Sequence, residues 1–285
     1  MERRFLLAAV FVVLTAWRAL PTSPLPELAD ELYANAMSLY EQGRFTEALP
    51  LARKLVAVDE KALGPNHLDF AKDLNLLGLL NHQLRHYAEA QTAYERSLAI
   101  REKQLRPDHP DIAQSLNNLG LLYIAEGHYV AAERVLKRAL AIRVKAFKPD
   151  HPDIGLSLRN VGNVYAKQGR CADAEPLYEQ SLQIFEKVFG PDHPYVPLVL
   201  DDMAACYYKQ QNYAETEALL KKSLAIRERT RGPEHPDVEL TLRNLAALYR
   251  DQGRISEAQP LFRRAAAIRE KLQRDRSQTA QAPQF

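Results

Sequence analysis

Residues 106–144 read RPDHPDIAQSLNNLGLLYIAEGHYVAAERVLKRALAIRV, and this stretch decides the fold. Shifted by 42 residues in either direction, it nearly reproduces itself at residues 148–186 and 64–102. The same step of 42 separates a series of histidines, which are His67, His109, His151, His193 and His235. A fixed period of this size is the sequence signature of a solenoid, in which one structural unit is stacked many times. The sequence therefore predicts a chain of stacked repeats.

Each repeat is predicted to be a hairpin of two α-helices. Leu116, Leu119, Gly120 and Tyr123 have the spacing of one helix face, and no segment alternates as a half-buried strand does. We therefore expect an all-α solenoid of about six helix-turn-helix repeats over residues 28–272. The polar residues 273–285 are expected to form a disordered tail. The first helices of the repeats are expected at residues 28–42, 70–84, 110–126, 152–168, 196–210 and 236–252.

Residues 1–20 differ from everything that follows. Arg3 and Arg4 precede an uncharged apolar run at residues 5–17, which is the layout of a secretory signal peptide. The run is shorter than the roughly 20 residues of a membrane-spanning helix. We expect an exported protein, periplasmic or secreted, and an uncleaved N-terminal membrane anchor is the variant of that prediction. The alternative is a cytoplasmic chain whose apolar helix packs on the first repeat. Three prolines then predict a linker at residues 21–27.

Composition bounds the remaining choices. In 285 residues, 46% are hydrophobic and 26% are charged, as in an ordinary folded protein. The net charge of +2 argues against a nucleic-acid binder. Cys171 and Cys206 form no zinc-type spacing, and we expect both to pack as small apolar side chains. A disulfide bridge between neighbouring repeats is the alternative.

Small residues recur at the positions where two helices would approach each other. Gly78 and Gly120 belong to such a column in the first helices. Glycine within a helix costs about 1 kcal/mol relative to alanine, so its repetition indicates that a neighbouring helix needs the space. Large residues such as Tyr94 and Leu136 are expected to fill the gap between repeats.

The recurring histidines invite a metal-site interpretation, which spacing argues against. Donors to one zinc ion lie within about 4 Å of each other, whereas packed helices are about 8–10 Å apart. We therefore predict that the histidines have a structural role at the helix starts and that no metal is bound. At His109, the following Pro110 suits the first helical position and Asp111 suits the first turn.

These columns resemble the tetratricopeptide repeat: glycine or alanine in the first helix, a tyrosine three residues on, glycine at the turn and alanine in the second helix. The 42-residue period and the segments LNNLGLLY, AEPLYEQSL and FGPDHP are similar to the repeats of kinesin light chains and their bacterial relatives. The resemblance covers residues 27–272. It implies a right-handed superhelix whose concave groove is lined by the first helices and binds an extended peptide. No heptad coiled coil of kinesin light chains is present, which argues against motor-cargo adaptation.

The groove residues follow from the resemblance and from their place beside the packed glycine. A carboxamide offers a donor and an acceptor to a peptide unit, and arginine can fork onto a carboxylate. Asp201 and Asp202 would instead favour a ligand with a basic group. The alternative is that all of these residues belong to solvated helix faces. The predicted peptide-binding residues are Asn75, Asn117, Asn118, Arg159, Asn160, Asn163, Lys167, Asp202, Lys209, Arg243 and Asn244, with Tyr208 and Arg250 farther along the same face.

The sequence carries no catalytic motif: it lacks G-x-S-x-G, H-E-x-x-H, a Walker loop and a Rossmann glycine cluster. We therefore predict a non-catalytic scaffold, with no cofactor, that binds a peptide or a partner protein in its groove. The alternative function is a structural or oligomer-forming component of a cell-envelope assembly that uses its outer surface or ends. Membrane attachment would come only through the N-terminal segment, and the sequence does not predict the oligomeric state.

Overall fold

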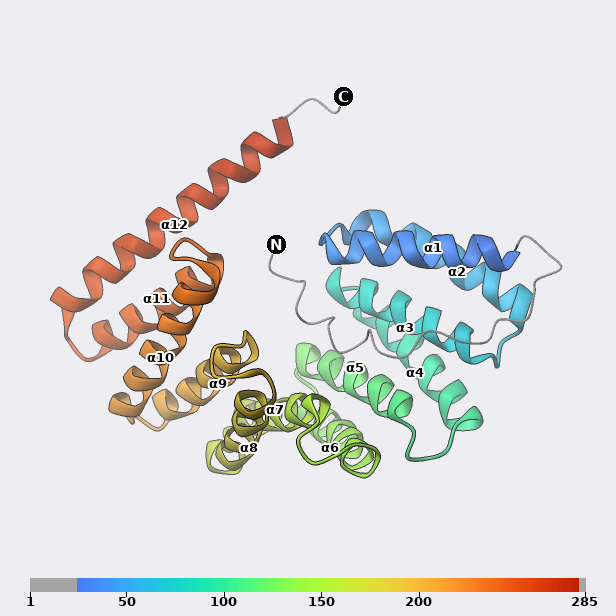
Figure 1. The fold of residues 1–285 in the computed structure, drawn as a ribbon, viewed down its shortest axis with the longest axis horizontal. Helices are drawn as coiled ribbons and strands as arrows, with labels where there is room; N and C mark the ends of the chain where they lie inside the picture. Colours follow the sequence, from blue (N-terminus) through green and yellow to red (C-terminus); the bar gives the residue numbers. More distant parts are fainter. Residues whose placement is uncertain (1–24, 282–285) are drawn as a thin grey trace. The chain divides into compact units, whose positions relative to one another are not determined.

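The structure is a computed structural model that describes the backbone of residues 25–281 and the side chains of residues 27–274. The described residues form twelve α-helices joined by short turns, with no strand among them (Figure 1). The prediction of an all-α helical-hairpin solenoid is confirmed. The helices are α1 (Leu25–Glu41), α2 (Phe45–Leu63), α3 (Leu68–Gln83), α4 (Tyr87–Gln104), α5 (Pro110–Glu126), α6 (Tyr129–Ala146), α7 (Pro152–Lys167), α8 (Cys171–Phe189), α9 (Tyr195–Lys209), α10 (Tyr213–Arg231), α11 (Pro236–Asp251) and α12 (Ile255–Gln281).

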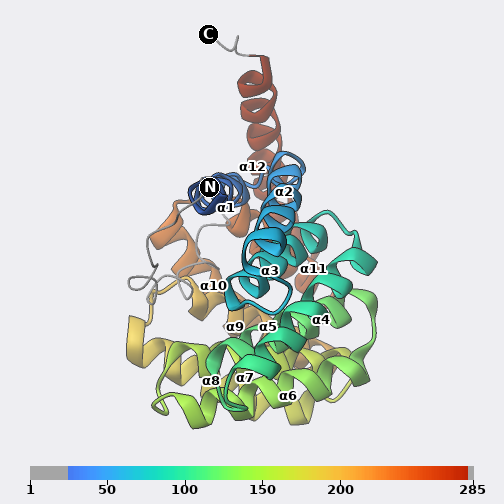
Figure 2. The same cartoon turned by 90° about the vertical axis from the view of Figure 1, so that its right-hand side faces the viewer.

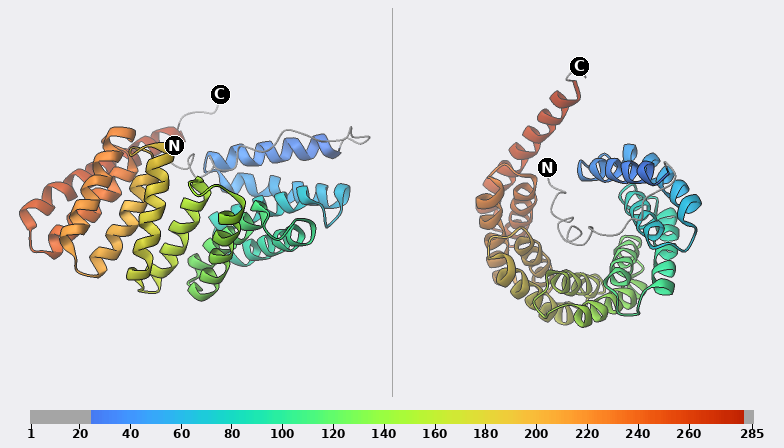
Figure 3. Two further views of the ribbon diagram at one scale, coloured as in Figure 1. Left: turned by 60° about the horizontal axis from the view of Figure 1, so that its bottom comes forward. Right: turned by 45° about the vertical axis from the view of Figure 1, so that its right-hand side comes forward.

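The chain divides into two compact units, and the boundary falls within α7 after Val164. In the first unit each helix packs on the next from α1 to α5, α5 packs on α6, and first helices also touch across repeats (α1 with α3, α3 with α5). Figure 2 shows the blue hairpin α1–α2 followed by the hairpin α3–α4. In the second unit α8 to α12 follow one another in the same way, as the yellow-to-red helices of Figure 3 (left) show.

The recurring histidines cap the first helices. The backbone N–H of Asp111 donates to Nδ1 of His109 at 3.1 Å, and the N–H of Asp237 donates to Nδ1 of His235 at 3.3 Å. His67, His151 and His193 accept the same bond from the residue two positions on. These bonds satisfy backbone donors that have no partner within the helix. The structural role predicted for the histidines is confirmed, and no metal is needed to explain their period.

The turn inside each hairpin needs a left-handed residue. Gly127 ends α5 with φ +80°, a conformation that glycine adopts without strain. The second repeat has Arg85 at the equivalent position, with φ +62°. A side chain is disfavoured in that conformation, so the second turn is less favourable locally than the turns that carry glycine.

The glycine column leaves room for a large side chain of the same hairpin. A methyl group at Gly78 would lie 2.5 Å from Cε1 of Tyr94, and one at Gly120 would collide with Leu136. The prediction that a neighbouring helix needs the space is confirmed. However, the large side chains, Tyr94 and Leu136, belong to the second helix of the same hairpin as the glycine. They therefore pack within a hairpin, whereas the prediction placed them only between repeats.

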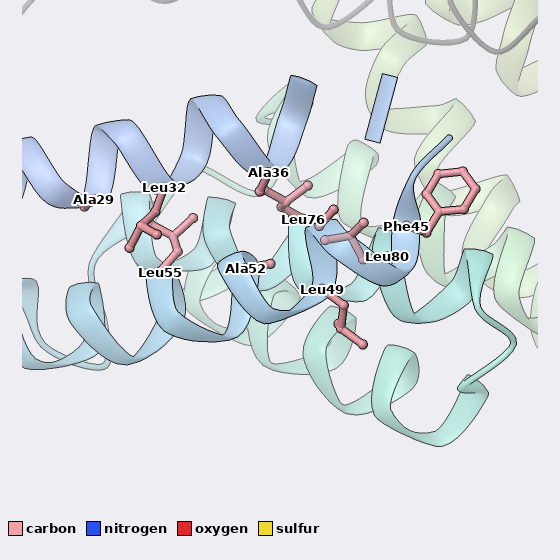
Figure 4. Close-up of a cluster of buried hydrophobic side chains, with 10 residues drawn as sticks. Ala29, Leu32, Ala36, Phe45, Leu49, Ala52, Leu55, Leu76 and Leu80 are labelled. Carbon is pink, nitrogen blue, oxygen red and sulfur yellow. The ribbon is translucent and has the colours of Figure 1, made fainter. Parts of the chain in front are cut away.

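Several junctions between hairpins bury a layer of apolar side chains. Figure 4 shows the first of these, in which residues of α1, α2 and α3 meet. Ala36, Ala52 and Leu80 are fully buried there, and Leu55 almost so. Because no single hairpin can bury this surface alone, stability comes from contact with the neighbours on either side. The labelled members of this cluster are Ala29, Leu32, Ala36, Phe45, Leu49, Ala52, Leu55, Leu76 and Leu80.

The ends of the described chain differ from the predicted bounds. Helix α1 begins at Leu25, within the predicted linker, because Pro26 lies in a first turn, where a missing N–H costs little. Helix α12 continues to Gln281, through most of the predicted disordered tail, since residues 273–281 contain neither glycine nor proline. The predicted signal or anchor at residues 1–20 lies outside the described residues. Within them, no helix combines the length and apolarity that a bilayer crossing requires.

Cys171 and Cys206 form a disulfide between α8 and α9, with their Cα atoms 5.4 Å apart. This distance lies in the normal range for a bridged pair. Both residues are buried, at 5% and 4% exposure, so their predicted burial is confirmed. The prediction that they only pack as small apolar residues is wrong, because helix packing brings two residues 35 apart into contact.

Candidate partner-binding face

The predicted groove asparagines of the first unit bond to one another across repeats. Nδ2 of Asn118 donates to Oδ1 of Asn75 at 2.8 Å, which joins α5 to α3. Nδ2 of Asn160 donates to Oδ1 of Asn117 at 2.8 Å, which joins α7 to α5. The recurrence of asparagine therefore has a structural cause: each pair ties one first helix to the next.

These carboxamides are also largely covered. Asn117 is 8% exposed, Asn118 is 4% exposed and Asn160 is 9% exposed. Asn118 also accepts a hydrogen bond from Nε2 of Gln114 at 3.2 Å. Little of the hydrogen-bonding capacity of these carboxamides is therefore open to a ligand. Asn75, Arg159 and Asn163 are half-buried beside them.

In the second unit, the predicted residues of α9 and α11 are more accessible. Lys209 and Asn244 are exposed, and the side chains of Arg243 and Arg250 are 50% and 58% exposed. Arg243 lies 3.7 Å from the Glu239 carboxylate, an ordinary exposed contact of weak strength. The exposed Lys167 lies at the end of α7, where this unit begins. These predicted residues are therefore accessible from the solvent.

Neighbouring contacts set the geometry of this face. The hydroxyl of Tyr208 donates to the carboxylate of Asp251, so the C-terminal ends of α9 and α11 are tied together. Nε of Arg250 donates to the same carboxylate at 2.9 Å. Nζ of Lys209 donates to the backbone oxygen of Ala166 at 2.8 Å. These contacts hold the three side chains in defined positions on the surface.

Asp201 and Asp202 are both half-buried, and Asp201 is engaged within the protein. The carboxylate of Asp201 pairs with the buried guanidinium of Arg227 at 2.6 Å. Burial raises the pKa of Asp201, and Arg227 acts in the opposite direction. Asp201 also occupies the repeat position of Asn75 and Asn117, whose side chains accept a hydrogen bond from an asparagine of the next repeat. Asn244, at the position in the last repeat that corresponds to Asn118 and Asn160, is exposed.

A column of buried arginines was not predicted from the sequence. Arg101, Arg143 and Arg227 each end an A-I-R triplet in a second helix and reach the next first helix. NH1 of Arg101 donates to Oγ of Ser115 at 2.8 Å, and NH1 of Arg143 donates to Oγ of Ser157 at 2.7 Å. Arg227 bonds in the same way to Thr241. The signal was present as an arginine followed by a hydroxyl residue fourteen positions later, but arginine is normally read as a surface residue.

At the first junction this pair is replaced by two aspartates. Asp59 stands in the arginine column and Asp73 in the hydroxyl column, and both are buried. Burial, and then the hydrogen-bonded Asp59 carboxyl, raise the pKa of Asp73 to about 9. The Asp73 carboxyl is therefore protonated at neutral pH. One oxygen of each aspartate has no hydrogen-bond partner, which is unfavourable for a buried polar group.

The outer helices carry ion pairs at the same period. Glu60 meets Arg96, Glu102 meets Arg138, and in the second unit Glu186 meets Lys222 and Glu228 meets Arg264. Each pair joins one second helix to the next. Many charges of the outer surface are thus used between repeats, while the most accessible basic groups of the predicted site lie on α9 and α11. In the described residues no cluster of three or more histidine, cysteine or carboxylate side chains could hold a metal ion.

Several solved structures are similar in fold to this chain. BtubC (BKLC) from P. vanneervenii shares 20% identity over 88% of this chain and 93% of its own, with a TM-score of 0.64. A kinesin light chain candidate from Podosopora anserina with nearly identical TPR-like repeats shares 25% identity over 74% of this chain and 99% of its own, with a TM-score of 0.63. PilF from Pseudomonas aeruginosa shares 18% identity over 89% of this chain and 100% of its own, with a TM-score of 0.58.

No curated protein sequence matches this chain significantly. The tetratricopeptide repeat profile, however, matches residues 29–103, 74–145, 153–215 and 195–271. Together these matches cover nearly all of the described helices. This chain therefore belongs to the tetratricopeptide repeat family.

Proposed function

We propose that this chain is a non-catalytic scaffold that binds an extended peptide or a partner protein on the face formed by its first helices. Membership of a repeat family whose members act as protein-interaction scaffolds supports a protein partner. The recurring histidine, arginine and asparagine side chains of the repeats bond within the protein, so none of them needs a catalytic role to explain its presence.

One observation carries the placement of the site. The α9–α11 face, defined here by Tyr208, Lys209, Arg243, Asn244 and Arg250, presents three cations and one carboxamide at exposed positions on rigid helices. Such groups can donate to the carbonyls and carboxylates of a bound chain. The asparagines of the first unit are buried and bonded to each other, so we place the first contact with a partner on this face.

The test is affinity capture of partners from the protein's own cell with two matched variants. Arg243→Ala/Asn244→Ala removes two side chains of the α9–α11 face, and Lys222→Ala removes an exposed cation of the outer helices. We expect the double variant to lose specific partners that wild type and Lys222→Ala retain, with equal helicity by circular dichroism in all three. Unchanged capture by the double variant would refute the placement of the site. Loss in Lys222→Ala alone would favour the outer-surface function, which concentration-dependent light scattering would then test.

We further propose that the protein is exported. Two features support this: the basic and apolar segment at residues 1–20, and the buried disulfide, since such bonds persist mainly in oxidising compartments. Cell fractionation followed by N-terminal sequencing tests this proposal. Recovery in the cytoplasmic fraction with both cysteines reduced would contradict it. An intact N-terminus in the membrane fraction would indicate the anchor.

A further inference from the structure

The disulfide occupies positions that hold an apolar contact at the other junctions. Cys171 is the first residue of a second helix, and the equivalent residues are mostly aromatic: Phe45, Tyr87, Tyr129, Tyr213 and Ile255. Cys206 lies in the following first helix, where the equivalent residues are aliphatic: Leu80, Leu122, Val164 and Leu248. Each aromatic residue precedes its aliphatic partner by the 35 positions that separate the two cysteines.

At the other junctions these residues hold neighbouring hairpins together. Phe45 and Leu80 belong to one buried cluster that joins α2 to α3 (Figure 4). Tyr87 packs against the cluster that contains Leu122, and Tyr213 packs against the cluster that contains Leu248. An aromatic ring against leucine buries a large apolar surface, which is the main stabilising effect between stacked repeats.

Two cysteines cannot replace that contact by packing, because their side chains are much smaller than a ring and a leucine. The structure has a small cavity at this point, lined by both cysteines and by Tyr178, Met203 and Tyr207 among others. The covalent bond therefore does here what apolar burial does elsewhere. Without it, the turn end of the α8–α9 junction would be the least well packed of these junctions.

The opposite end of the same junction does not depend on the bond. There the rings of Phe185 and Tyr195 lie 4.9 Å apart, and the ring of Phe189 stacks on His193 at 4.2 Å. Near the disulfide, the hydroxyl of Tyr207 donates to Glu175, but Tyr249 makes the same kind of bond to Glu217 at the next junction in addition to its apolar cluster. The aromatic end can therefore remain closed while the turn end opens.

We propose that the α8–α9 junction is a redox-controlled hinge. With the disulfide formed, α9 is fixed to α8 at both ends. When a dithiol reductant attacks one sulfur and its second thiol resolves the mixed disulfide, two electrons pass to the pair. The products are the Cys171 and Cys206 thiols and the oxidised reductant. Because a repeat contacts only its neighbours, no other part of the second unit compensates for the lost bond, and the turn end of the junction opens.

The test is hydrogen–deuterium exchange on the full chain, with the disulfide first verified by intact mass. We expect reduction with a phosphine to speed exchange in α8 and α9 by at least about tenfold, with little change in α5 and α6 of the first unit. Cys171→Ser/Cys206→Ser should exchange like the reduced protein. Cys171→Tyr/Cys206→Leu, which restores the contact of the other junctions, should stay protected and should not respond to the phosphine.

The outcomes separate the hinge from a general effect of the reductant. Equal exchange of the oxidised and reduced wild type would overturn the proposal, as would two free thiols in protein purified without reductant. A response to phosphine in Cys171→Tyr/Cys206→Leu would show that the reductant acts elsewhere. If that variant fails to fold, the serine variant and the wild-type comparison still decide the question. The proposal does not depend on the identity of any partner.

Discussion

Replacing Gly78 with alanine tests whether helix preference or helix packing controls the repeat. In an isolated helix the change should be favourable, because alanine is better than glycine in a helix interior by about 1 kcal/mol. In this protein the new methyl carbon would lie 2.5 Å from Cε1 and 2.6 Å from Cδ1 of Tyr94. Non-bonded carbons prefer separations of about 3.5–4.0 Å, so the ring must move by about 1 Å.

The structure gives the ring no room for that movement. Tyr94 is fully buried, in a cluster that also holds Ile112 and Leu116 of the next repeat. Overpacking of a closed core costs about 1–3 kcal/mol. Against the gain of about 1 kcal/mol from helix preference, we expect Gly78→Ala to destabilise the protein by about 1 kcal/mol, or roughly 2 if the backbone must also shift.

Urea unfolding followed by circular dichroism measures this difference, and a double-mutant cycle with Tyr94→Ala assigns its cause. Once the ring is removed, the alanine at position 78 should become favourable, so the two changes should not be additive. Ala204→Gly is the matched control, because the same column carries a buried alanine in the second unit. That control should lose stability through both helix preference and packing. If Gly78→Ala proves stabilising beside an intact Tyr94, the packing argument is refuted.

Three further outcomes follow from buried groups. Because the pKa of Asp73 is raised from 3.8 to about 9 in the folded protein, the contribution of this residue to stability should be fully present below about pH 4 and be lost as the pH rises towards 9. Asp73→Asn should remove this part of the pH dependence and be the more stable protein at pH 8, by about 1–3 kcal/mol in urea titrations; parallel pH profiles of the two proteins would contradict the prediction. Arg143→Met, which leaves Ser157 without its hydrogen-bond donor, should lower the free energy of unfolding by about 1–3 kcal/mol. The control Arg138→Met on the outer surface should lower it by no more than about 1 kcal/mol, and equal shifts of the melting temperature would argue against the buried contact. Cys171→Ser/Cys206→Ser should lower the unfolding free energy by about 4 kcal/mol, the value for a closed loop of 35 residues; a change below about 1 kcal/mol would mean that the bond adds little.

Local signals allowed the helices to be predicted from the sequence. The residues that begin and end a helix lie within a few positions of the bonds they make, as His109 with Asp111 and Gly127 with the carbonyls of Tyr123 and Ile124 show. The expected start of α5 at Pro110 and its end at Glu126 agree with the structure for this reason. At Pro26 and in residues 273–281 the helices extend farther than predicted.

The candidate site was predicted less completely, because exposure is not a local property. The sequence placed Asn118 on the correct helix and next to the packed glycine. It could not show whether water or another side chain faces the carboxamide. In the structure the carboxamide of Asn75 from the previous repeat faces Asn118, and Asn118 is buried, whereas Asn244 is exposed.

The sequence by itself therefore determined the period, which is read directly from the recurring residues, and the helical hairpins with many of their capping residues, because caps depend on chemistry within about one helical turn. The tertiary structure alone decided which polar side chains are used inside the solenoid. The pairings of Asn75 with Asn118, of Arg143 with Ser157 and of Cys171 with Cys206 join residues 43, 14 and 35 positions apart. Such partners become neighbours only when one hairpin is packed on the next, and only that packing sets the few angstroms that separate a bonded pair from a solvated surface.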